Sequence, residues 1–139
     1  MICDRLKFIE YGSPEYLQAA RLRYRLFYEE HGIEFESIFE PSEKQSLHLV
    51  ITSNIDLVLA YGRLDRKSVD QFQIYQMVVE PTYQRQGLGT AILKTLIAAA
   101  TERGASIVLL NARVAMQFYE VFASSSTGVP HIRMQKRIF

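Results

Sequence analysis

The sequence has little cysteine, little net charge and no long hydrophobic run. One cysteine, Cys3, in a chain of 139 residues cannot form an internal disulfide, so we expect an intracellular, cytoplasmic protein. The formal net charge of +1 gives no general reason to expect nucleic acid or an anionic membrane as partner. A chain of this length buries about two-thirds of its unfolded surface on folding, so it needs no disulfide or metal to stabilise it. We expect one domain over residues 1–139.

Targeting segments, membrane spans and metal-ligand clusters are also missing. The N-terminal stretch mixes charged and apolar residues and has no hydrophobic region typical of a signal peptide. No run approaches the ~20 apolar residues that a membrane helix needs. The three histidines are scattered, and no pair has the spacing of metal ligands. We therefore expect neither a metal site nor a membrane-spanning segment.

Hydrophobic periodicity predicts an α+β fold in the order β-α-β-β-β-α-β-α-β. Ser13 followed by Pro14 is a typical helix start, because the hydroxyl caps and proline fits the first position. The expected helices cover residues 14–32, 88–103 and 112–122. The expected strands cover residues 6–11, 47–52, 55–64, 71–79, 106–110 and 131–138.

The first expected helix and the segment after it contain several residues whose role the sequence leaves open. We expect the helix to pack through Tyr16, Leu17, Ala20, Tyr24, Phe27 and Tyr28, with Arg21, Arg23 and Arg25 mostly on its other faces. Residues 33–46 are long for a connector, which indicates a functional role. This segment contains four glutamates, Glu34, Glu36, Glu40 and Glu43. Their negative charge favours a cationic amine as neighbour. We interpret His48, in the middle of a strand, as a satisfied structural histidine.

Residues 84–89 read Gln-Arg-Gln-Gly-Leu-Gly between an expected strand and an expected helix. The start of a helix has unpaired N–H groups and the positive end of the dipole, and both attract phosphate. Gly87 and Gly89 let a phosphate approach the backbone without a Cβ in the way, and Arg85 can add a charge-assisted bond. A Walker loop is absent, and Ile92 stands where a dinucleotide-binding turn has its third glycine. The stretch predicts a polyanion cradle of another kind.

The motif and its surroundings resemble the GNAT family of N-acetyltransferases. The family's phosphate loop, Gln/Arg-x-x-Gly-x-Gly/Ala, matches residues 84–89, which follow Val79-Glu80-Pro81 and precede an apolar helix. The stretch "VLLNARVAMQFYEVF" looks like the family's second motif. The stretches "RYRLFYEEHGIEFE" and "GVPHIRMQK" look like those of small bacterial members. The resemblance covers nearly the whole chain and implies the GNAT-type acyl-CoA N-acyltransferase fold, a central mixed β-sheet flanked by helices.

The resemblance also implies an activity and a set of site residues. The reaction would be direct transfer of the acetyl group of acetyl-CoA to a primary amine, with no metal. The implied pantetheine contacts come from the main chain of Met77, Val78 and Val79, and from Asn111. The implied pyrophosphate contacts come from Gln84, Arg85, Gln86, Gly87, Leu88, Gly89 and Thr90. Tyr119 matches the family tyrosine that faces the thioester sulfur and would protonate the leaving thiolate.

Departures from the family pattern leave other interpretations open. The stretch from Asn111 to Tyr119 is one residue shorter than the family pattern, and the usual Gly-Phe after the tyrosine is missing. Asn111 could instead cap the following helix, Tyr119 could be a core residue, and Glu80 could act as a base or accept bonds in its turn. The alternative functions are a CoA-binding or sensory module without turnover and an acyl-homoserine-lactone-type synthase. The expected partners are acetyl-CoA and a small or protein amine, and a homodimer stays open.

Overall fold

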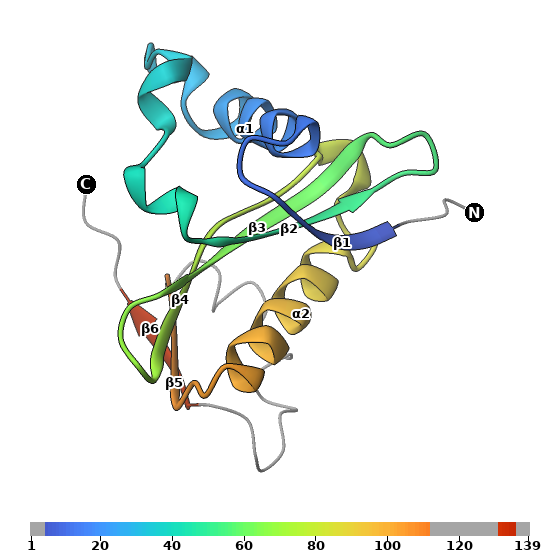
Figure 1. Ribbon diagram of the computed structural model, residues 1–139. Coiled ribbons are helices and arrows are strands. Elements are labelled where there is room, and N and C mark those ends of the chain that lie inside the picture. The colour runs from blue at the N-terminus through green and yellow to red at the C-terminus, as the bar shows by residue number, and fades with distance from the viewer. Residues whose placement is uncertain (1–4, 112–130, 136–139) are drawn as a thin grey trace.

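The computed structural model describes residues 5–111 and 131–135, and its strands form one mixed sheet in the order β1-β2-β3-β4-β5-β6 (Figure 1). An antiparallel meander is formed by β1 (Arg5–Ile9), β2 (Leu47–Thr52), β3 (Val58–Arg66) and β4 (Gln71–Val79). Two more strands continue the sheet in parallel, β5 (Ile107–Asn111) beside β4 and β6 (His131–Gln135) beside β5. The expected α+β order is confirmed over the described residues, and the expected helix 112–122 lies outside them.

The strand boundaries follow the sequence pattern closely, with shifts of one or two residues in β1 and β5 and a later start of β3. β2 and β4 have the bounds that the alternation predicts. β3 begins at Val58, three residues later than expected, because a turn occupies the residues before it. The N–H of Ser53 donates to Leu57 O at 2.8 Å, and Ser53 Oγ accepts from the N–H groups of Ile55 and Leu57. These bonds satisfy the turn locally, so its backbone does not join the sheet.

The helices lie on opposite faces of the sheet (Figure 1). On one face, α1 (Pro14–Phe27) is followed by three short 3₁₀ helices, η1 (Glu29–His31), η2 (Phe35–Ile38) and η3 (Pro41–Lys44). On the other face lies α2 (Leu88–Glu102). The Ser13 hydroxyl caps α1 as expected, accepting from the N–H of Tyr16 at 3.2 Å. The α-helix ends earlier than Gly32, which instead closes η1 with φ at 71°.

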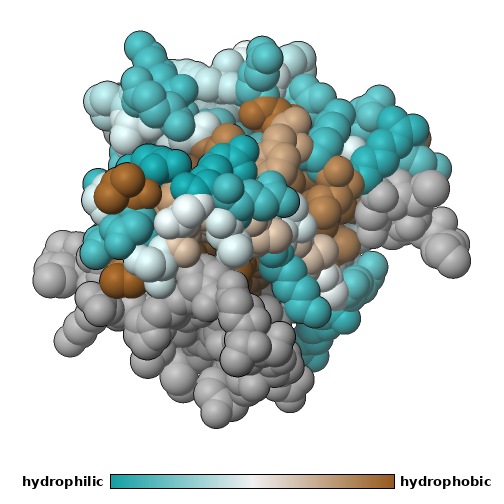
Figure 2. All heavy atoms as spheres, turned by 60° about the horizontal axis from the view of Figure 1, so that its bottom comes forward, coloured by the Kyte–Doolittle hydropathy of each residue, from teal (hydrophilic) through white to brown (hydrophobic). Residues whose placement is uncertain are grey.

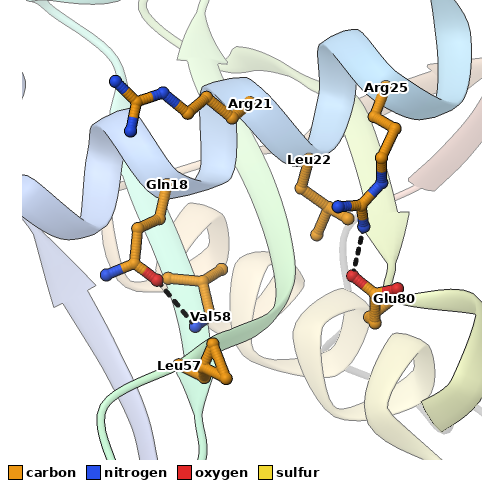
Figure 3. A pocket seen from close by; sticks show the side chains of 7 residues that line it. All are labelled: Gln18, Arg21, Leu22, Arg25, Leu57, Val58 and Glu80. Atoms are coloured by element: carbon orange, nitrogen blue, oxygen red, sulfur yellow. Dashed lines mark hydrogen bonds and ion pairs between the residues drawn. The ribbon is translucent and has the colours of Figure 1, made fainter.

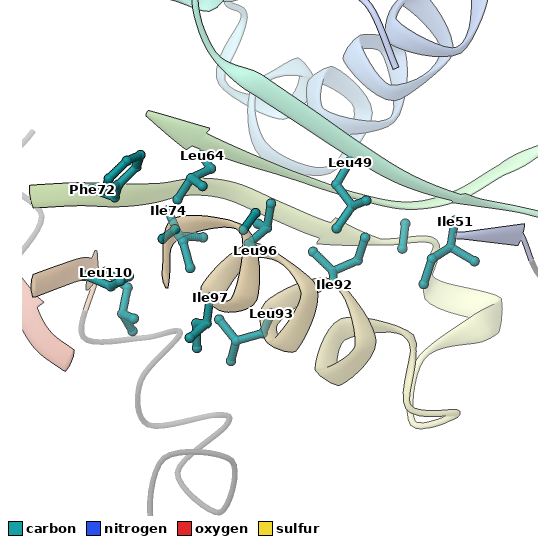
Figure 4. Packing of buried hydrophobic residues seen from close by; sticks show 14 of the residues in the cluster. Leu49, Ile51, Leu64, Phe72, Ile74, Ile92, Leu93, Leu96, Ile97 and Leu110 are labelled. Carbon is teal, nitrogen blue, oxygen red and sulfur yellow. The ribbon is translucent and has the colours of Figure 1, made fainter. Parts of the chain in front are cut away.

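The α2 face of the sheet holds the larger apolar core (Figure 4). Buried residues of the strands, among them Leu49, Phe72 and Ile74, meet the buried leucine and isoleucine residues of α2. Gly62 makes this close approach possible. A Cβ at that position would lie 2.6 Å from Ile92 Cγ2, so any larger residue would push α2 away from β3.

The buried face of α1 differs from the expected one. Its buried residues are Tyr16, Ala19, Ala20, Leu22 and Arg23. Leu17 and Phe27, both expected in the core, are instead 42% and 36% exposed. The expectation that Arg23 lies on an outer face is wrong, because its side chain is fully buried against the sheet. The apolar periodicity of α1 therefore identifies the packing face only in part, since Tyr16 and Ala20 are buried as expected.

The edge strand β1 leaves two large apolar side chains partly open. The register pairs Leu6 with Ile51 and Phe8 with Leu49, so both side chains lie on the α2 face. Leu6 is 45% and Phe8 46% exposed. Figure 2, which brings the α2 side forward, shows hydrophobic residues gathered in a band between hydrophilic ones. None of the described helices has both the length and the apolar character needed to cross a bilayer.

Candidate acyl-CoA site

The pairing between strands β4 and β5 ends at the candidate site. Their parallel pairing joins residues 71–73 to residues 107–109 and goes no further. β4 continues to Val79, so residues 74–79 have no partner strand on the β5 side within the described part of the chain. An unpaired strand segment of this kind can bond an extended ligand as if it were an added strand.

The main-chain groups that face this gap follow from the alternation along β4. The N–H of Glu80 donates to Leu59 O on β3 at 2.8 Å. Neighbouring residues in a regular strand direct their polar groups to opposite sides, so Val79 directs its groups away from β3. The bond from Gln84 Nε2 to Val79 O, at 3.2 Å, agrees with this direction. The N–H group of Val79 is thus turned toward the gap, and Met77 lies two residues before it.

A β-bulge at Gln76 and Met77 interrupts the pairing of β4 with β3. The β3–β4 register gains one residue on the β4 side between the pairs Tyr61–Val78 and Arg63–Tyr75. Gln76, inside the bulge, has φ at 56°, in the left-handed region that residues other than glycine rarely adopt. A bulge bends its strand and changes the direction of the groups that follow it. The bulge therefore helps to set where the end of β4 points.

The chain leaves β4 through η4 (Pro81–Tyr83) and a left-handed turn. Arg85 and Gly87 have φ at 66° and 82°. A Cβ at Gly87 would meet nothing within 4 Å, so glycine is favoured there by backbone conformation and not by lack of space. Residues 84–87 are exposed. Turns of this kind point successive N–H groups into one concavity, which suits an anion.

The start of α2 supplies further donors. Its first hydrogen bond runs from the N–H of Ala91 to Gly87 O at 3.0 Å, so the helix does not use the N–H groups of Leu88, Gly89 and Thr90. No side chain of the described residues caps this end. Leu88 is buried in the α2 core, so only its main chain is available to a ligand. Unused donors at the positive end of a helix form a ready anion site.

The structure brings most of the expected site residues to one place. Residues 77–79 and 84–90 follow one another around the end of β4 and the start of α2. Asn111 is the last residue of β5, and since β5 runs parallel to β4, the carboxyl ends of both strands lie at the same side of the sheet. Tyr119 lies outside the described residues. No group of three or more His, Cys, Asp or Glu residues among the described ones could hold a metal ion.

A shallow groove between α1 and the end of β4 adjoins this site (Figure 3). Its lining residues are Gln18, Arg21, Leu22, Arg25, Leu57, Val58 and Glu80. Arg25 Nη2 forms an ion pair with Glu80 Oε2 across it. Gln18 Oε1 accepts from the N–H of Val58 at 3.2 Å. The carboxylate of Glu80, directly after β4, is therefore held beside the groove by a cation.

The α1 face carries a buried charged network that the sequence did not predict. Glu43, fully buried, accepts from Tyr16 Oη at 2.6 Å and Arg23 Nη1 at 3.3 Å through Oε1. Its Oε2 accepts from the N–H of Glu40 at 2.7 Å and lies 3.5 Å from Arg63 Nη1. Burial alone would raise the pKa of Glu43, but these hydrogen bonds and the two guanidinium groups hold it below its ordinary value. The idea that Glu43 attracts a cationic amine is wrong, because two arginines already neutralise it.

His48 completes this network as a structural residue, as expected from the sequence. Its Nε2 lies 2.7 Å from the carbonyl oxygen of Glu43 and its Nδ1 2.7 Å from Tyr61 Oη. A carbonyl can only accept, so Nε2 carries the proton and the Tyr61 hydroxyl donates to Nδ1. Burial lowers the pKa of His48 and raises that of Tyr61. Both residues are therefore uncharged near neutral pH.

These features define a class of protein. A mixed sheet whose β4 separates from β5, followed by an anion-binding turn at the start of the next helix, is the GNAT-type acyl-CoA N-acyltransferase fold. Residues 15–123, well over half of the chain, match the sequence model of the Acetyltransferase (GNAT) family. The chain belongs to that family, whose acyl donor is an acyl-CoA.

Solved structures share this fold at low sequence identity. An acyl-CoA N-acyltransferase from Pseudomonas aeruginosa is similar with a TM-score of 0.67 and 21% identity, covering 88% of this chain and 87% of that one. Glucosamine-6-phosphate N-acetyltransferase from Arabidopsis thaliana gives 0.63 and 19%, covering 97% and 99%. An aminoglycoside 6'-N-acetyltransferase solved with coenzyme A gives 0.57 and 17%, covering 73% and 57%. These likenesses concern the fold.

Proposed function

We propose that this protein transfers the acetyl group of acetyl-CoA to the primary amine of a small molecule or a protein. One observation carries the proposal: the unpaired end of β4 leads directly into the left-handed turn and the unused N–H groups of α2. A single ligand with amides at one end and a pyrophosphate in the middle matches this succession of groups. Acetyl-CoA has that chemistry.

Each part of the site takes a role in binding. The N–H groups of Met77 and Val79 would bond the pantetheine arm, with Asn111 on its other side. The N–H groups of residues 84–90 would hold the pyrophosphate, and the exposed Arg85 would add a charge-assisted bond. Gln84 now bonds Val79 O, so it would either keep that carbonyl occupied or release it to the ligand. The resulting complex would place the thioester beside the bulge of β4.

The chemistry follows from this placement. The amine must be neutral to attack, so a base takes its proton, and Glu80 is the carboxylate beside the groove. A carbon–nitrogen bond forms, the carbon–sulfur bond breaks, and Tyr119 would give a proton to the leaving thiolate. A main-chain N–H near Val79 would stabilise the negative charge that develops on the thioester oxygen. Most of the rate would come from holding amine and thioester together.

Binding and turnover can be tested separately. A ligand at about 100 times its dissociation constant stabilises a protein by ~2.7 kcal/mol, so acetyl-CoA should raise the melting temperature. Thiol release with a panel of amines, with mass spectrometry of the product, then reports transfer. A melting temperature that millimolar acetyl-CoA does not move would contradict the proposal. Binding without turnover on any amine would favour a CoA-binding module instead.

A further inference from the structure

Arg23 connects helix α1 to the bulge of β4. Its Nη1 donates to Gln76 Oε1 and lies 3.3 Å from Glu43 Oε1. The guanidinium carbon lies 5.2 Å from the centre of the Tyr61 ring, at cation–π distance. The side chain is fully buried, so its position is determined by η3 on one side and by the sheet on the other. It holds the amide of Gln76 from this determined position.

Gln76 is a residue that needs such support. Its backbone is left-handed in the middle of a strand, a strained conformation for a residue with a side chain. Strained backbone persists only where the surroundings enforce it, and it occurs most often at functional sites. The hydrogen bond that the structure describes for the Gln76 side chain comes from Arg23. The contact between α1 and the bulge thus fixes the one residue of β4 with unusual backbone geometry.

Stability alone does not explain the placement of Arg23. Its Nε and Nη2 are buried, and neither has a hydrogen-bond partner among the described residues. Two unsatisfied donors on a buried cation oppose folding, although the ion pair with Glu43 compensates its charge. An incompletely satisfied buried group in a native protein calls for a functional explanation. The contact of Arg23 with β4 offers such an explanation, because its hydrogen bond to that strand is made with Gln76 in the bulge.

We infer that Arg23 is a positioning residue for acyl transfer, acting through Gln76. By holding Gln76 in its left-handed conformation, Arg23 sets the direction of the N–H groups of Met77, the next residue of the bulge, and of Val79 beyond it. The inference rests on the proposed function, which assigns these groups to the pantetheine arm and the thioester. Arg23 itself contacts neither acetyl-CoA nor the amine. Glu43, through its bond to the same guanidinium nitrogen, makes the 3₁₀ segment after α1 part of the arrangement.

Two substitutions at Gln76 separate contact from conformation. Gln76→Asn tolerates positive φ but is one methylene shorter, so it loses the bond from Arg23. Gln76→Glu keeps the length and an acceptor oxygen, so it retains that bond. Tyr16→Phe is the matched control, because it removes a bond to Glu43 in the same network without touching Gln76. We measure kcat, KM for acetyl-CoA, acetyl-CoA affinity and melting temperature for all three.

The expected result is a split between rate and affinity. Gln76→Asn should lower kcat by about 10–100-fold, the scale of an ångström-sized misplacement, and acetyl-CoA affinity should fall less, because the pyrophosphate contacts of residues 84–90 do not depend on the bulge. Gln76→Glu should recover most of the rate, and Tyr16→Phe should lose stability but keep its kcat. Wild-type kcat in Gln76→Asn, or an equal loss in Tyr16→Phe, would overturn the inference alone. A wild-type protein without turnover on any amine would overturn the proposed function and this inference with it.

Discussion

The two faces of the sheet are built on different principles. The buried side chains of the α2 face form an apolar cluster, and they interlock with a helix that Gly62 allows to come close. The α1 face combines a smaller apolar cluster with fully buried Arg23, Glu43 and Arg63. The gap of the candidate site opens at the end of β4, between these two layers. We infer that the α2 face supports the site through its packing, whereas the α1 face sets the backbone geometry of β4 at the site through its charged contacts.

The largest effect on stability is expected from Glu43→Ala on the α1 face. Removing one partner of a buried ion pair costs about 3–5 kcal/mol, and here two guanidinium groups lose their shared carboxylate. Chemical denaturation measures the change in the free energy of unfolding. Glu36→Ala, an exposed glutamate of the same segment, is the control and should leave that free energy unchanged. Equal free energies of unfolding in the two variants would show that the charged network does not stabilise the fold.

A truncation on the α2 face should have a similar or slightly smaller effect. Leu96 is fully buried between α2 and the strands, and Leu→Ala changes in cores cost about 2–5 kcal/mol. Denaturation reports the loss. If this face only anchors the site, kcat at a temperature where Leu96→Ala stays folded should match that of the wild type. A fall in kcat as large as that of Gln76→Asn would erase the proposed difference between the faces.

A substitution in the turn before α2 should lower the free energy of unfolding less than these core changes do, but it should weaken acetyl-CoA binding more. Gly87→Ala forces a Cβ into the left-handed region, at about 1–2 kcal/mol, although no atom clashes with it. If the backbone relaxes, the converging N–H groups separate and acetyl-CoA affinity falls. Calorimetric titration and thermal unfolding give both numbers. Gly104→Ala, at the other end of α2 with φ at 91°, is the control, since it carries the same strain far from the turn. Equal loss of affinity in both variants would contradict the anion cradle.

How much of this the sequence predicts differs between the two faces. The pattern of residues 71–103 predicts β4, the turn and α2, because alternation, glycine spacing and helical periodicity are local signals. The sequence predicts an outer face for Arg23, since arginine in an amphipathic helix normally reaches solvent. Its partners Glu43 and Gln76 are 20 and 53 positions away, and only the fold brings them together. The left-handed conformation of Gln76 has no local signal either, because glutamine does not favour it.

The smallest expected effect is a pH dependence that comes from His48. Burial holds the pKa of His48 below its ordinary value of ~6.5, so the folded protein binds fewer protons there than the unfolded chain. Its contribution is complete above about pH 6.5 and declines as the pH falls toward the folded pKa, by at most ~1.4 kcal/mol per pH unit. His48→Gln should flatten this slope between pH 7.5 and 5. A slope in His48→Gln equal to that of the wild type would contradict the assignment.

The most direct test of the central claim is a crystal structure of the protein with acetyl-CoA. We expect the pyrophosphate oxygens within hydrogen-bond distance of the N–H groups of residues 84–90. The pantetheine amides should pair with the main chain of Met77 and Val79, in the gap where β4 has left β5. A pyrophosphate bound elsewhere, with the turn before α2 empty, would contradict the account.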